Sequence, residues 1–71
     1  MMEPKYPELE AQFSLSGPSG NAFYILGTVA KLLRNAGHGD EVKTFQDEAT
    51  KGDYEDLKAT IARWISVEFY D

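Results

Sequence analysis

The sequence contains no cysteine, which excludes a disulfide framework and a thiolate metal site. It has one histidine, His38, between two glycines in a predicted turn, where we expect it to be exposed. The longest apolar run, around Phe23–Leu26, is far shorter than the roughly 20 residues of a transmembrane helix. The first residues also lack the basic and apolar regions of a signal peptide. We therefore expect a cytoplasmic protein with no metal, no cofactor and no membrane association.

The 71 residues suffice for one domain, and the 42% hydrophobic content is too high for a disordered chain. A domain of this size buries only about 60% of the surface that its unfolded chain exposes. Tight packing or self-association must therefore stabilise it. We expect a flexible N-terminal arm over residues 1–7, which contains Pro4 and Pro7, and a single α+β domain over residues 8–70.

The spacing of apolar residues predicts five elements. Strict alternation predicts two strands, and apolar residues three or four apart predict three helices. Asn21, Asp40 and Asp53 are the expected helix N-caps, and Gly37 and Gly52 are expected to end the first and second helices. The predicted elements are a strand over residues 8–16, helices over about 22–36, 40–51 and 53–63, and a strand over 65–70.

The two predicted strands must pair with each other, because a lone strand cannot satisfy its backbone groups. The expected fold is therefore β-α-α-α-β, with three helices packed on a two-stranded sheet formed by the terminal strands. The sequence does not decide the strand direction, and we expect antiparallel pairing. A two-stranded sheet leaves two free edges, so a homodimer through an edge strand is a further expectation.

Two segments carry a family resemblance. Gly20–Gly27 reads GNAFYILG, and Glu48–Tyr54 reads EATKGDY, with Leu57 and Trp64 at similar spacing behind it. Together they resemble a family of short proteins common in phage, prophage and plasmid sequences, over roughly residues 8–68. The resemblance implies a mobile-element setting and brings no activity, cofactor or catalytic residue with it.

The first of these segments has a local structural interpretation. Phe23 is expected to pack back towards the strand. A glycine inside a helix costs about 1 kcal/mol relative to alanine, so Gly27 needs a reason. Close packing by the preceding loop or by a strand is one reason, and a shallow groove for a partner is the other. We predict a partner surface on the polar face of this helix, formed by Tyr24, Gly27, Thr28, Lys31 and Asn35.

The net charge of −5 is concentrated in residues 40–56, which contain seven acids and two lysines, so 2 − 7 = −5. A solvated helical face explains this pattern, but the same charge also suits a basic partner. We assign a candidate acidic patch to Asp47, Glu48, Asp53 and Asp56. Direct nucleic-acid binding is not expected, because the third helix would present acids to the phosphates.

These observations support a small non-enzymatic protein-interaction module of phage or mobile-element origin, with no catalytic residue assigned. Its partner would be a host or phage protein. The alternative is an acidic DNA mimic that occupies the nucleic-acid site of a host protein. The loop over residues 17–20 lacks the lysine of a phosphate-binding loop, so nucleotide chemistry is not expected either.

Overall fold

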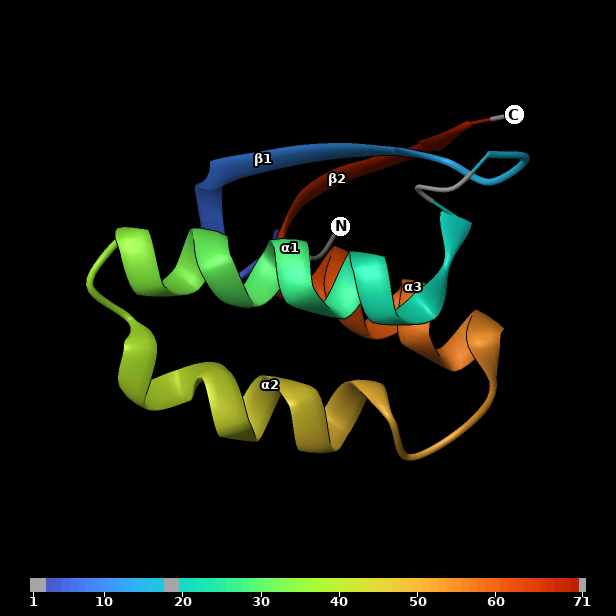
Figure 1. Ribbon diagram of the computed structural model, residues 1–71. Helices are drawn as coiled ribbons and strands as arrows, with labels where there is room; N and C mark the ends of the chain where they lie inside the picture. The colour runs from blue at the N-terminus through green and yellow to red at the C-terminus, as the bar shows by residue number, and fades with distance from the viewer. Residues whose placement is uncertain (1–2, 18–19, 71) are drawn as a thin grey trace.

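The computed structural model describes residues 3–17 and 20–70 and confirms the α+β class and the β-α-α-α-β order. The two strands lie side by side on one side of the molecule, α1 and α3 lie against them, and α2 is farthest from the sheet (Figure 1). The elements are β1 (Tyr6–Ser14), α1 (Ala22–Asn35), the 3-10 turn η2 (Gly39–Glu41), α2 (Val42–Ala49), α3 (Tyr54–Trp64) and β2 (Ile65–Tyr70).

The predicted antiparallel pairing is wrong, because β1 and β2 are parallel. Each helix runs opposite to the element before it, and β2 runs opposite to α3 (Figure 1). Four reversals of direction therefore separate the two strands, and an even number returns the chain to its first direction. The aligned pairs run from Glu10 with Ser66 to Ser14 with Tyr70.

The start of β1 is irregular and lies two residues earlier than predicted. Tyr6 aligns with Ile65, whereas Glu10 aligns with the very next residue of β2, so the intervening part of β1 bulges. Pro7 lies in this bulge and has no N–H to donate to a ladder. The Ser66 hydroxyl donates to the Pro7 carbonyl at 2.7 Å. Residues 6 and 7 thus belong to the sheet, and the expected flexibility of the arm over residues 1–7 stays a prediction.

The helix ends confirm some predicted caps and correct others. Gly37 has a φ of 87° after α1, as expected of a left-handed cap. Asp40 caps no helix, since it lies inside η2, and α2 begins only at Val42. The second helix also ends earlier than Gly52, at Ala49. Within the described part of the chain, no helix is long and apolar enough to cross a membrane.

The core lies between the sheet and the helices and is built around aromatic side chains. The Phe45 and Trp64 rings meet edge to face with centroids 5.6 Å apart, and Phe13 stacks on Phe69 at 5.8 Å. Trp64 follows the prediction of a core position, being 5% exposed. The remaining core residues are Ile25, Val29, Ala30, Leu33, Val42, Ala49, Leu57, Ile61 and Ile65.

Truncation of Phe45 tests the core. Phe45 is fully buried against Trp64, so Phe45→Ala is expected to lower the free energy of unfolding by about 3–5 kcal/mol. Lys43→Ala on the wet face of the same helix breaks only an exposed ion pair and should cost less than about 0.5 kcal/mol. Urea unfolding followed by circular dichroism measures both. Equal losses would contradict this packing.

Candidate partner-binding groove

An apolar groove of about 320 Å³ lies where the two family-like segments meet. The start of α1 forms one wall, and the α2–α3 turn with the first turns of α3 forms the other. These parts lie at the same end of the molecule (Figure 1). The lining residues are Ala22, Phe23, Leu26, Ala49, Thr50, Gly52, Asp53, Tyr54 and Leu57.

A hydrogen bond between the two segments holds the groove together. The Tyr54 hydroxyl on α3 donates to the carbonyl of Gly20, just ahead of α1. A side chain at position 20 would come within 2.7 Å of the Leu15 carbonyl oxygen, so a glycine is required there. Asn21 then caps α1, as predicted, by accepting from the Phe23 amide at 2.8 Å. The first segment is thus fixed against β1 and α3 before the helix begins.

The opposite wall is shaped by a capping box. Asp53 accepts from the Asp56 amide at 3.0 Å, and the Asp56 carboxylate accepts from the Asp53 amide at 3.1 Å. The same Asp56 side chain fills the space that a side chain on Gly52 would need. Position 52 therefore requires a glycine because of packing. The φ of Gly52 is not positive, so Gly52 is not a left-handed cap.

Phe23 is where the structure departs most from the sequence analysis. It was expected to pack towards the strand, but 84% of its surface is exposed at the rim of the groove. On a helical wheel it falls beside Gly27 and Arg34, outside the apolar face centred on Val29. This position on the wheel was the signal in the sequence that identifies it as a surface residue. An exposed phenylalanine beside an apolar groove is a feature often found at protein-binding surfaces.

Gly27 lies one helical turn after Phe23 and is also exposed. A Cβ built on it would meet no heavy atom within 4 Å in the described part of the chain. Close packing by the loop or by a strand, one of its two expected reasons, is therefore excluded for those residues. What remains is an uncovered stretch of helix backbone next to an exposed ring.

The predicted partner surface does lie on one side of α1, but its members differ in exposure. Tyr24 is 54% exposed, and its ring meets Phe13 edge to face with centroids 6.2 Å apart. Lys31 and Asn35 are exposed, and Thr28 is half-buried. The packing of Tyr24 on β1 turns this side of the helix towards the sheet, whereas Phe23 and the groove lie towards α2. The prediction of a partner surface here stays open.

The residues of the predicted acidic patch have local structural tasks. Glu48 accepts from the Trp64 indole N–H at 3.0 Å, and Asp47 pairs with Lys43 at 3.4 Å. Asp53 and Asp56 form the capping box described above. A cavity of about 250 Å³ between α2 and α3 is also lined by both signs of charge: Glu48, Lys51, Asp56 and Arg63 are among its residues. The surface is therefore mixed in charge at this place.

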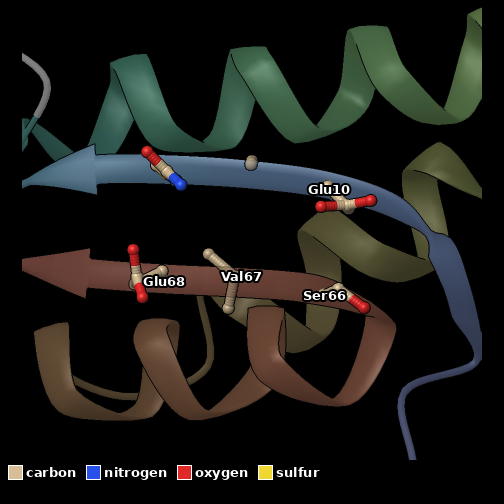
Figure 2. Close-up of a pocket in the computed structure, with 6 residues that line it drawn as sticks. Glu10, Ser66, Val67 and Glu68 are labelled. Carbon is tan, nitrogen blue, oxygen red and sulfur yellow. The ribbon is translucent and has the colours of Figure 1, made fainter.

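A larger hollow of about 570 Å³ lies over the sheet, between β1 and β2 (Figure 2). Glu10 and Glu68 are exposed there, on opposite strands, while Ala11 and Val67 are half-buried. The hollow is shallow, and two like charges border it. It has the form of a solvated sheet face, and we assign no chemistry to it.

A polar cluster at the opposite end of the molecule was not foreseen. The Glu41 carboxylate accepts from the Tyr6 hydroxyl and from the Lys5 ammonium. The Tyr6 ring stacks on His38 with centroids 4.0 Å apart, so His38 is half-buried instead of exposed. The cluster joins the start of β1 to the α1–α2 turn. Within the described residues, no group of three or more His, Cys, Asp or Glu side chains is placed to hold a metal.

Comparisons of the chain with protein-family models, with curated proteins and with solved structures gave no match. The family resemblance of the two segments therefore stays a prediction.

Substitution of Gly27 tests whether the monomer needs this glycine. Since a Cβ at this position meets no atom of the described residues, Gly27→Ala is expected to raise the free energy of unfolding by about 0.5–1 kcal/mol. Urea titration at low micromolar protein concentration measures this change. Gly37→Ala is the matched control. Its φ of 87° makes alanine strained there, so stability should fall by about 1 kcal/mol or more. A loss at both positions would show that Gly27 has a role inside the monomer.

Proposed function

We propose that this chain is a non-enzymatic protein-interaction module that binds a polypeptide partner at the groove beside Phe23. The observation that carries the proposal is the 84% exposure of Phe23 at the rim of an apolar groove. Both family-like segments contribute to that groove, although Gly27 and Glu48 are 21 positions apart in the sequence (48 − 27 = 21). Binding sites commonly combine an aromatic anchor with a preformed apolar depression.

The groove also indicates the chemistry of its partner. Its walls are mainly apolar, so it suits a large apolar side chain, which would bury against Leu26 and Leu57. Asp53 is the charged residue of the lining, and the next acid, Glu55, has a side chain that is 78% exposed. The segment over residues 40–56 carries −5 in all. A partner with an apolar anchor and nearby basic groups is therefore favoured, because opposite charges steer association.

The DNA-mimic alternative has less support. A mimic needs an array of carboxylates that replaces the regular charge of a phosphate backbone. Here Asp53 and Asp56 cap a helix, Glu48 bonds to Trp64, and Lys51 and Arg63 lie among them. This mixed arrangement favours short-range charge contacts at the edge of an apolar site.

Photo-crosslinking from position 23 tests the proposal. A chain with benzoylphenylalanine in place of Phe23 is expected to form a specific adduct with a polypeptide when irradiated in bacterial cells. The matched control places the same amino acid at Tyr70, an aromatic residue that is 49% exposed on β2. Adducts are separated by mass and mapped by peptide sequencing. Absence of an adduct at position 23, or the same adducts from both positions, would overturn the proposal.

A further inference from the structure

The exposed side of α1 carries complementary features four residues apart. Phe23 projects from it with 84% of its surface exposed, and Gly27 leaves the next turn bare. Residues four apart lie on neighbouring turns, about 6 Å apart along the axis. At this spacing, the Phe23 ring of one copy can pack against the bare turn at Gly27 of a second copy, and the reverse contact forms at the same time. When two such helices lie antiparallel about a two-fold axis, Phe23 of each copy faces Gly27 of the other.

We propose that the partner of this surface is a second copy of the chain, joined by antiparallel packing of α1 on α1. This inference rests on the proposed function, since it names the partner that covers Phe23 and the adjoining rim of the groove. Gly27 allows the two helix backbones to approach closely, and each Phe23 ring lies over the bare turn of the other copy. The ring also covers the rim of the groove, including Leu26.

Charge complementarity supports a second copy. The charged residues of α1 are Lys31 and Arg34, both basic, and both follow Gly27 in the helix. In the antiparallel arrangement, the part of α1 after Gly27 in one copy extends past the start of α1 in the other copy. In that other copy, the start of α1 lies beside the α2–α3 turn, where Asp53 lines the groove. The basic half of each α1 thus approaches the start of α3 in the other copy, twice per dimer. The acids there, Asp53, Glu55 and Asp56, outnumber the nearby lysines, Lys51 and Lys58.

The chain therefore presents the chemistry that its own groove favours, an apolar anchor followed by basic groups. The same contact gives a reason for the glycine, which the neighbours of Gly27 among residues 3–17 and 20–70 do not provide. An edge-strand dimer, the form expected from the sequence, would leave both Phe23 and Gly27 in solvent. Locating the contact, on α1 or on a strand edge, therefore distinguishes the α1 dimer from the edge-strand dimer.

Sedimentation of the purified chain tests the inference. The wild type is expected to show a reversible monomer–dimer equilibrium. Phe23→Ser, which removes the ring, and Gly27→Leu, which fills the bare turn, should each weaken dimerisation about tenfold or more. Glu10→Gln, a substitution of an exposed acid over the sheet and away from the groove, should leave it unchanged. Circular dichroism shows that each variant remains folded, which is expected because both positions are exposed.

The crosslinking chain, purified alone and irradiated, locates the contact. The expected product has twice the mass of the chain, with the bond from position 23 mapping near Gly27. A monomer at all concentrations, or a dimer that both variants leave intact, overturns the second copy as the partner. If position 23 then still crosslinks another protein in cells, the proposed function stands without this inference. If position 23 forms no adduct in either setting, both are wrong.

Discussion

The two strands can lie side by side only because three helices return the chain from the end of β1 to the start of β2. The direction alternates at every step, so the parallel pairing follows from the number of helices. Each helix has to bury one face against the other helices or against the sheet. The small core, with Phe45 and Trp64 in contact at its centre, is the result of that constraint.

The same alternation sorts the connections into two groups at opposite ends of the molecule. The start of α1 and the α2–α3 turn lie at one end, and there they form the groove (Figure 1). The start of β1, the α1–α2 turn and the α3–β2 junction lie at the other end. There the Lys5 amide donates to the Arg63 carbonyl at 2.8 Å, and Tyr6 and His38 stack. One end is thus closed by polar contacts, and the other presents apolar surface.

The sequence predicted the elements well because their signals are local. Apolar spacing placed α1 and β2 within about a residue of their observed bounds, and Asn21 and Asp53 cap as expected. It failed where distant parts of the chain decide the outcome. The relative direction of the strands depends on how many times the chain reverses between them. The spacing of apolar residues does not show this number. His38 was expected in solvent because its stacking partner, Tyr6, is 32 residues away in numbering (38 − 6 = 32).

The candidate site was predicted only in part, for a related reason. Gly27 stood out because a glycine inside a helix is destabilising, and no described residue packs against it closely enough to require a glycine. Phe23 does not pack towards the strand as expected, because its angle on the helical wheel lies outside the apolar face of α1. Burial of this side chain would contribute roughly 1.5–3 kcal/mol, which is large beside the roughly 5–15 kcal/mol net stability of a typical domain. The exposed Phe23 ring and the helix-interior Gly27 lie on the same side of α1. A single contact that covers this side would bury the ring and give the glycine a packing role.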